Sequence, residues 1–333
     1  MTTDSKVVEL TGDEITIKER TPLQVVLMRF RKHKLAMISL ILMFAIFLVT
    51  LFASSLANFE VQEIKVGDYL LSPGAVDVKT GRVHLLGTDN IGRDYFSRLL
   101  YAGRISLTVA FLSVIISETT GMVVGAISGY YGGVLDNVIM RFVEFMLTVP
   151  SLPLLLIISS MLLANENLIP IPPVILNFIG KIMLLNARDA RSAVLIVIVL
   201  AGFGWLGSAQ LMRGMVLQIK QQTFVEAARS LGASNIWIIF RHMIPNALAP
   251  IIVSASLGLA GYVVAEASLS FLGFGIQEPI PTWGNMLAAT QTYMLDKPYL
   301  PLIPGTPIFV CSLAFNYIGD GLRDALDPRS RAV

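Results

Sequence analysis

The sequence has few charged side chains and a single cysteine. Of its 333 residues, 14% are Asp, Glu, Lys or Arg, compared with about 25% in soluble domains. Hydrophobic residues make up 54% of the chain, and this balance predicts a protein that lies in lipid. The net charge of +2 gives no reason to expect a nucleic-acid partner.

Several chemistries are excluded by what is missing. The one cysteine, Cys311, lies in an apolar run, so an internal disulfide or a cysteine-based metal site is excluded. The histidines at 33, 84 and 242 are too scattered to indicate a metal site. The sequence contains no GxxxxGK[ST] phosphate loop, no GxSxG and no HExxH. We therefore expect a non-catalytic chain that binds no cofactor of its own.

What the sequence does contain is long runs with almost no charge. Leu35–Ala57 is 23 uncharged residues, and a membrane-spanning helix needs about 20. Five similar segments follow: Ile105–Gly129, Phe142–Leu163, Ser192–Leu211, Ala247–Ala265 and Leu302–Gly319. Because backbone groups in hydrocarbon must be satisfied internally, helices are the expected form. The fold class predicted is an all-α integral membrane protein with six transmembrane helices.

Positive charge predicts how these helices are oriented. The first 34 residues hold seven lysines and arginines, and such residues favour the cytoplasmic side. Both termini are then cytoplasmic, as is the segment 213–246. The expected parts are a cytoplasmic tail (1–34), the first transmembrane helix (35–57), an extracytoplasmic loop with an interfacial helix (58–104), a transmembrane core (105–321) and a second cytoplasmic tail (322–333).

The segment 213–246 is a polar island between two apolar spans. Within it, "TFVEAARSLG" is rich in helix formers, and Gly232 is suited to end that helix in a left-handed conformation. Ser234 can cap a second short helix. This pattern predicts a helix–turn–helix under the membrane with Trp237 and its neighbours exposed to a partner. A solvated amphipathic loop is the alternative at this point.

Motifs in and around this island resemble a known family. Glu226-Ala227-Ala228, then Gly232, then a run ending in Ile244-Pro245, resemble the EAA loop of permease subunits of ATP-binding-cassette importers, although His242 stands where that motif prefers isoleucine. The stretches 84–107, 129–155, 266–287 and 314–331 resemble the dipeptide/oligopeptide/nickel permease family, specifically its C-type subunit. The resemblance covers about residues 20–333.

The resemblance implies a type I ABC importer permease fold in a prokaryotic cell membrane. It implies import of peptides, with nickel chelates or oligosaccharides as the alternative. The implied partners are a related second permease subunit in a heterodimer, two cytosolic ABC ATPase subunits that bind ATP and magnesium, and an extracytoplasmic solute-binding protein. The residues implied in ATPase coupling are Glu226, Ala227, Ala228, Leu231, Gly232, Ser234, Trp237 and Pro245. Glu226 is expected to pair with Arg229 or to bind backbone in the loop.

Glu118 lies in the middle of the second span. A carboxylate there should face the bundle or water, so it either lines the substrate path or bonds neighbouring helices, and both remain open. A secondary transporter driven by an ion gradient would need paired ionisable groups at this depth, and a membrane scaffold would carry nothing.

Three other features bear on helix packing. Gly121, Gly125 and Gly129 form a stripe that predicts close helix approach. Pro150 and Pro153 are expected to kink the third span. Asp136, Arg141 and Glu144 are expected to pair at the cytoplasmic rim, whereas the loop 164–191 is assigned no role.

Overall fold

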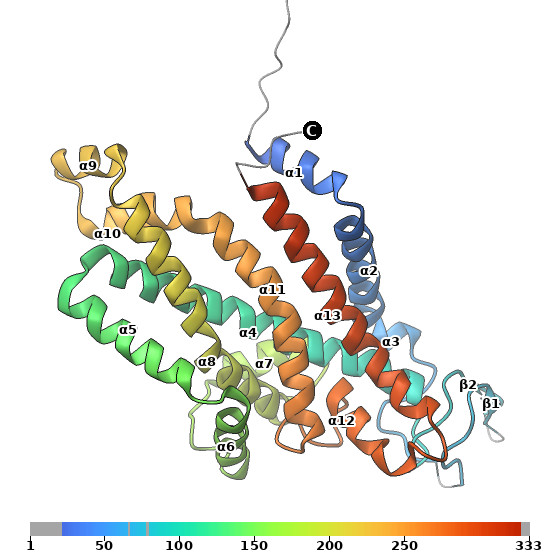
Figure 1. Ribbon diagram of the computed structural model, residues 1–333. Helices are drawn as coiled ribbons and strands as arrows, with labels where there is room; N and C mark the ends of the chain where they lie inside the picture. Colours follow the sequence, from blue (N-terminus) through green and yellow to red (C-terminus); the bar gives the residue numbers. More distant parts are fainter. Residues whose placement is uncertain (1–21, 66, 78–79, 328–333) are drawn as a thin grey trace, which may run out of the picture.

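The computed structural model describes residues 22–65, 67–77 and 80–327. Long helices form a tilted bundle (Figure 1). The helical elements are α1 (Pro22–Lys32), α2 (Lys34–Leu51), α3 (Ala53–Leu56), α4 (Tyr95–Tyr131), α5 (Gly133–Thr148), α6 (Ser151–Ala164), α7 (Pro173–Met183), α8 (Ala187–Ile219), α9 (Thr223–Ser230), α10 (Asn235–Ile238), η1 (Ile239–Met243), α11 (Ile244–Phe271), α12 (Trp283–Ala289), η2 (Gln291–Tyr293) and α13 (Tyr299–Leu326). Two short antiparallel strands, β1 (Ala75–Val76) and β2 (Val83–His84), precede α4.

Five helical segments of the described residues are long and apolar enough to cross a membrane. They are α2, α4, α8, the continuous segment Asn235–Phe271, and α13. Each matches one predicted span, although the first is shorter than expected, because α2 ends at Leu51 and the separate α3 follows. The all-helical membrane fold is confirmed.

The third predicted span, 142–163, is not one helix. α5 and α6 meet at a bend of 93°. Val149 has extended backbone with ψ of 130°, as the residue before a proline prefers, and Pro150 has no N–H to continue the helix. Pro153 lies in the first turn of α6, where a proline is tolerated. If α5 and α6 together are counted as one membrane pass, the described residues have six spans.

α4 and α8 pack side by side along the glycine stripe. A Cβ atom on Gly125 would lie 2.3 Å from the Ala209 carbonyl oxygen, and one on Gly121 would lie 2.6 Å from that of Trp205. A Cβ atom on Gly129 would meet the Arg213 carbonyl oxygen at 3.0 Å. The predicted role of these glycines in close helix approach is therefore confirmed.

The interfacial helix expected within 58–104 is not a separate element. Asp94 caps α4 by accepting the Ser97 amide proton, and the helix then runs unbroken from Tyr95 to Tyr131. Tyr95 is buried in a cluster with Trp283 of α12, because α12 packs over the start of α4. Tyr95 therefore belongs to the core and not to a surface helix.

Ion pairs connect buried arginines at the start of α4 to a half-exposed glutamate in the loop between α11 and α12. Arg93 Nη1 and Arg98 Nη2 each donate to the Glu278 carboxylate at 2.8 Å. Arg93 Nε also donates to Asp89 Oδ2 at 2.6 Å. Burial lowers the pKa of Arg93, but the bond to Glu278 and the charges of Asp89 and Glu278 outweigh it, so the pKa is raised. These four residues, Asp89, Arg93, Arg98 and Glu278, are named the charge cluster.

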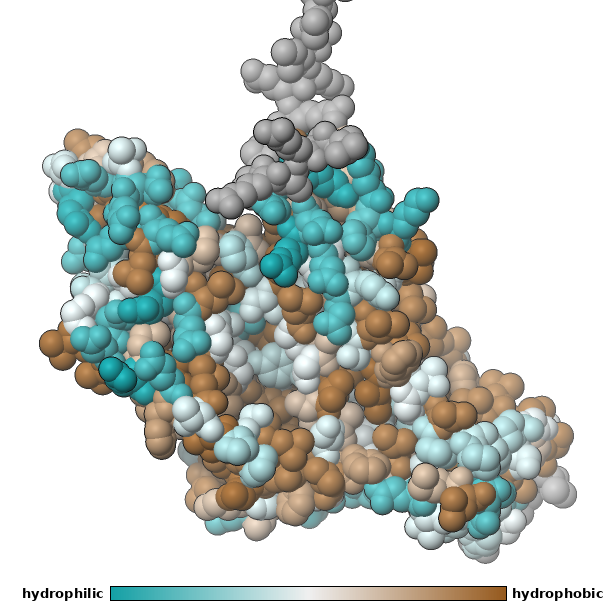
Figure 2. All heavy atoms as spheres, in the orientation of Figure 1, coloured by the Kyte–Doolittle hydropathy of each residue, from teal (hydrophilic) through white to brown (hydrophobic). Residues whose placement is uncertain are grey.

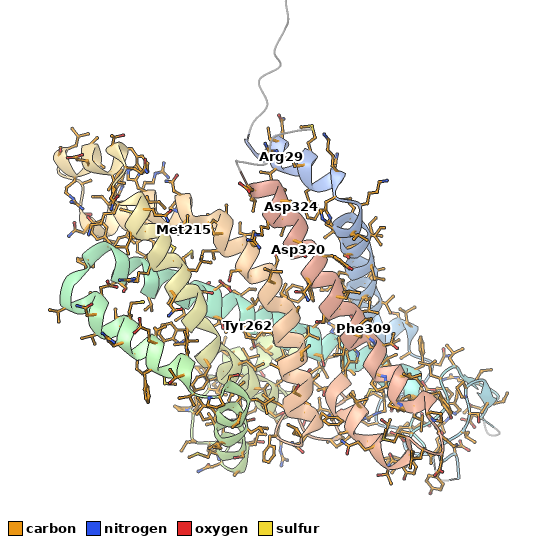
Figure 3. The ribbon with its side chains drawn as sticks, viewed as in Figure 1. Arg29, Met215, Tyr262, Phe309, Asp320 and Asp324 are labelled. Atoms are coloured by element: carbon orange, nitrogen blue, oxygen red, sulfur yellow. The ribbon has the colours of Figure 1, made fainter. Side chains whose placement is uncertain are left out.

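The two ends of the bundle carry different elements. The guanidinium of Arg29 on α1 donates to the Asp327 carbonyl at 2.9 Å, just past α13. Arg29 and Asp324 lie near each other in Figure 3, at the end of the molecule that also holds α9 and α10, whereas β1, β2 and α12 lie at the opposite end (Figure 1). Hydrophilic residues gather around α1 and α9, and apolar residues cover much of the middle (Figure 2).

Candidate functional site in the loop between α8 and α11

The polar island between α8 and α11 folds into two helices joined by a turn, as predicted. α9 is followed by Gly232, whose φ of +83° lies in the left-handed region that glycine adopts without strain. The Ser234 hydroxyl accepts the Trp237 amide proton at 3.3 Å and caps α10. Both residues have the conformation expected from the sequence.

Large apolar side chains of this loop face away from the bundle. Leu231 is 88% exposed, Ile236 66% and Phe240 55%. Together with the exposed Phe224 and Trp237, they are named the apolar loop patch. His242 is half-buried behind the patch, with its ring 4.9 Å from that of Trp237 and 5.7 Å from that of Phe224. Large apolar side chains exposed on a short polar loop are a candidate contact surface.

The loop is attached to the bundle by a buried apolar cluster. Val225 of α9 and Ile238 of α10 are almost fully buried. They pack with Met212 and Val216 of α8 and with Met243. The apolar loop patch therefore has a packed support under it.

Tyr130 at the end of α4 makes a second attachment, which the sequence analysis missed. Its hydroxyl donates to Asn235 Oδ1 at 2.8 Å, and its carbonyl accepts from Lys220 Nζ at 2.6 Å. The Arg229 guanidinium lies 5.7 Å from the ring centre, within the range of a cation–π contact. The end of α8, α9 and α10 thus meet at one buried side chain. The aromatic pair Tyr130-Tyr131 at the end of a span was the available signal.

An ion pair closes the same end of the bundle. Arg213 Nε and Nη2 donate to the two Asp136 carboxylate oxygens at 2.6 Å each, and Ser128 Oγ donates to Asp136 Oδ1 at 2.6 Å. The predicted group of three charges is only partly right. Arg141 lies 3.9 Å from Glu144 on the exposed face, while Asp136 pairs with α8.

α10 continues into α11 through one π-helical turn, Ile239–Met243. Pro245 comes two residues after this turn, and it has no N–H to donate. The Ile244 N–H bonds to the Ile239 carbonyl five residues back, and this wider turn accommodates the missing donor. The chain therefore stays helical from Asn235 to Phe271.

The other predicted coupling residues lie on α9. Glu226 and Ala227 are exposed and Ala228 is half-buried. Among the described residues Glu226 forms no ion pair, and the expected pair with Arg229 is not made, because Arg229 turns toward Tyr130. The Glu226 carboxylate is left on the surface of the loop.

Glu118, the predicted path residue, lies where three helices meet. Its carboxylate accepts from Ser208 Oγ of α8 at 2.6 Å and from Ser254 Oγ of α11 at 3.3 Å. Glu118 is half-buried on α4. These bonds join three helices. Bonding between helices is one of the two roles that the sequence left open for Glu118, and lining the substrate path is the other.

A cavity of about 450 Å³ lies between α6, α11 and α13. Its polar lining comes from Ser151, Ser268, Ser312 and Asn316. A smaller cavity of about 210 Å³ shares Ser151 with it and reaches Tyr262, which Figure 3 labels on α11. These small polar groups gave no signal in the sequence, because they are isolated serines within apolar runs.

Comparison with known proteins identifies the chain's relatives. Residues 121–332 match the family described as binding-protein-dependent transport system inner membrane component, and residues 21–73 match the N-terminal TM domain of oligopeptide transport permease C. The dipeptide transport system permease protein DppC of Alkalihalophilus pseudofirmus is 36% identical over 91% of this chain and 89% of that protein.

Two further relatives are also transport permeases that are similar to most of this chain. DppC of Haemophilus influenzae is 35% identical over 95% of this chain and 97% of its own length. The glutathione transport system permease protein GsiD of Pectobacterium atrosepticum is 36% identical over 75% of this chain and 74% of its own length. The chain therefore belongs to the binding-protein-dependent transport inner-membrane components, as a multi-pass permease of the C type.

Proposed function

We propose that this chain is a permease subunit of an ATP-driven importer of peptides, and that the loop between α8 and α11 couples it to cytosolic ATPase subunits. The observation that carries the proposal is the apolar loop patch, an exposed apolar surface on a packed support at one end of the bundle. A protein–protein contact would bury this surface.

The arrangement of the bundle supports a cytosolic position for the patch. α1, the end of α13 and the loop with α9 and α10 lie at the same end (Figure 1), which carries the basic side chains Arg29, Arg31 and Lys32. Positive residues favour the cytoplasmic side. The N- and C-terminal tails would then be cytoplasmic as well.

The coupling roles proposed for individual residues follow from their places. Leu231, Ile236 and Trp237 would contact the ATPase subunit. Gly232 and Ser234 would hold the turn between the helices, and Pro245 would follow the π turn that joins the loop to α11. Ala227 and Ala228 would allow close approach, beside the exposed Glu226. ATP and magnesium would be bound by the ATPase subunits, because this chain has no phosphate loop.

Peptide transport is proposed from the names of the relatives, which are permeases of dipeptide, oligopeptide and glutathione systems. A related second permease subunit would complete the membrane part, and a solute-binding protein would deliver the peptide from outside. The cavity between α6, α11 and α13 is proposed as part of the path, and Glu118 as a neighbouring polar group. Nickel chelates or oligosaccharides would use the same machinery.

Site-directed crosslinking tests the coupling role. A cysteine at Leu231, which is 88% exposed, should crosslink to a co-expressed ATPase subunit in a nucleotide-dependent way. Leu295 provides the matched control, since it is 90% exposed and lies before α13 at the opposite end. Cys311 is fully buried, so the wild-type chain is the background control.

Two results would contradict the proposal. One is a crosslink of equal yield from Leu295→Cys. The other is the lack of a crosslink from Leu231→Cys in a complex that purifies intact. Uptake that survives depletion of cytosolic ATP would instead favour an ion-gradient-driven transporter.

A further inference from the structure

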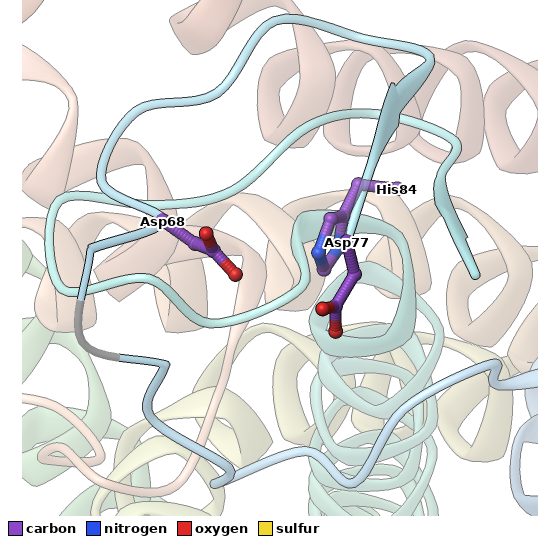
Figure 4. Close-up of side chains that lie close together, drawn as sticks. All are labelled: Asp68, Asp77 and His84. Carbon is purple, nitrogen blue, oxygen red and sulfur yellow. The ribbon is translucent and has the colours of Figure 1, made fainter. Parts of the chain in front are cut away.

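The segment before α4 brings three possible metal ligands together, at the end of the bundle opposite the apolar loop patch. Ligand atoms of Asp68, Asp77 and His84 all lie within 4.8 Å of one another. His84 is on β2, Asp77 directly follows β1, and Asp68 comes from the loop before them. Figure 4 shows the imidazole of His84 directed toward the two carboxylates.

His84 has the surroundings of a metal-ligating histidine. Its Nδ1 lies 2.8 Å from Asp94 Oδ1, and the whole side chain is buried. Its Nε2 is buried with no hydrogen-bond partner among the described residues. When a carboxylate accepts the Nδ1 proton, Nε2 is left with a free lone pair, and this is the usual arrangement behind a bound metal. A buried polar atom without a partner is otherwise costly.

The charges around the cluster favour a cation. Among the described residues, Asp68, Asp77 and Asp94 bring three carboxylates, and Lys65 brings one ammonium group, which pairs with Asp77. The same ammonium lies 3.9 Å from Glu63 Oε1. Lys65 therefore has a second carboxylate available when another cation takes Asp77, and the described side chains of the cluster carry more negative than positive charge.

We propose that Asp68, Asp77 and His84 bind one divalent transition-metal ion, with zinc as the best match. One imidazole nitrogen and two carboxylate oxygens suit zinc, at bond lengths of about 2.0–2.2 Å with a fourth position for water. The ligand atoms, which lie within 4.8 Å of one another, would have to move closer together around the ion. Because Asp94 also caps α4, the ion would tie the strand pair to the first turn of that helix.

Zinc titration of the full-length chain tests the site. The protein is purified in detergent without a polyhistidine tag, stripped with a chelator, and titrated against a chromophoric zinc chelator. One equivalent of zinc should bind. His84→Asn keeps a polar group near the Nδ1 position and removes Nε2, so affinity should fall roughly tenfold or more.

Two further variants sharpen the test. Lys65→Met removes a cation that pairs with Asp77 and should tighten zinc binding, on the order of tenfold. His33→Asn is the matched control, because His33 also lies near a carboxylate, 3.8 Å from Asp324, and the asparagine can still cap α2 at Ala36. Zinc affinity should be unchanged in this control.

Three results would overturn the proposal. The first is zinc that binds His84→Asn as tightly as the wild type. The second is the lack of saturable binding in the wild-type chain at micromolar zinc. The third is a Lys65→Met variant that binds no more tightly than the wild type, since the ammonium and the metal would then not compete for Asp77.

Discussion

The loop between α8 and α11 and the segment around the start of α4 lie at opposite ends of the bundle and bury opposite kinds of side chain. The loop exposes apolar groups such as Leu231 and Ile236 and rests on apolar packing. The start of α4 buries charged groups instead, with Arg98 at 1% exposure and Asp89 at 5%.

The difference separates residues that contact a partner from residues that stabilise the fold. An exposed apolar patch adds little to the stability of the isolated chain, so its loss should affect binding to a partner. Buried charges are costly once a partner is removed, so their loss should affect folding. The two ends should therefore respond differently to substitution.

Gly232→Asp should have the largest functional effect. An aspartate at φ +83° is strained, and the turn under the patch should shift. Stimulation of the ATPase by loaded binding protein should be lost, while the amount of protein in the membrane stays near wild type. Both quantities can be measured in proteoliposomes and by immunoblot.

Gly273→Asp is the matched control for that variant. Gly273 has φ of +82°, and like Gly232 it has open space where a Cβ atom would stand. It follows α11 at the other end of the bundle. Equal loss of stimulation in both variants would mean that backbone strain anywhere suffices, and the comparison between the two ends would fail.

Arg98→Met should have the largest effect on stability. It removes one of two arginines that pair with the buried Asp89 and the 43% exposed Glu278, so the loss should stay below the ~3–5 kcal/mol of a fully buried pair. A thiol-reactive dye that reports exposure of the buried Cys311 gives the thermal midpoint. Arg141→Met is the control, because Arg141 is 86% exposed and such pairs contribute about 0–1 kcal/mol. An equal fall of the thermal midpoint in Arg98→Met and Arg141→Met would contradict this expectation.

Tyr130→Phe should loosen the loop without removing it. The change deletes the hydroxyl bond to Asn235, worth about 1 kcal/mol, so amide hydrogen exchange across 223–243 should become about fivefold faster. Tyr131→Phe is the control, since Tyr131 is 49% exposed. Exchange that is equally fast in both variants would remove Tyr130 as the attachment point.

Glu118→Gln should have the smallest effect. The amide oxygen can still accept from Ser208, so a residue that only bonds helices tolerates the change, and peptide uptake should stay within about twofold of wild type. A fall of more than about tenfold would show that the carboxylate charge is needed and would support the path role.

The spans were predictable because each is a long run with almost no charge, and only helices satisfy such a backbone in lipid. Gly232 and Ser234 were predictable for a similar local reason, since turn and cap positions select particular residues. The break at Pro150 was underestimated, because the sequence gives the place of a bend but not its angle.

What escaped prediction depends on contacts between distant segments. The sequence analysis assigned no helix between the spans Ala247–Ala265 and Leu302–Gly319, yet α12 forms there and its Trp283 is buried against α4. Asp136 was paired with its neighbours in sequence, while its partner Arg213 comes from α8. The sequence does not show that Tyr130 contacts Asn235, Lys220 and Arg229, because these residues lie far from it along the chain. Spacing along the chain does not encode such pairings.

The helix that starts in the loop reaches the other end of the molecule. From Asn235 to Phe271 it holds 37 residues, a rod of about 55 Å. A tilt of about 5° at the loop moves the far tip by about 5 Å, nearly one helical turn. Just past that tip the chain leads to Glu278 in the charge cluster and then into α12. The π turn at Ile239–Met243 keeps the helix continuous. If the loop contacts an ATPase subunit as proposed, a displacement of the loop would be passed along this helix toward the charge cluster.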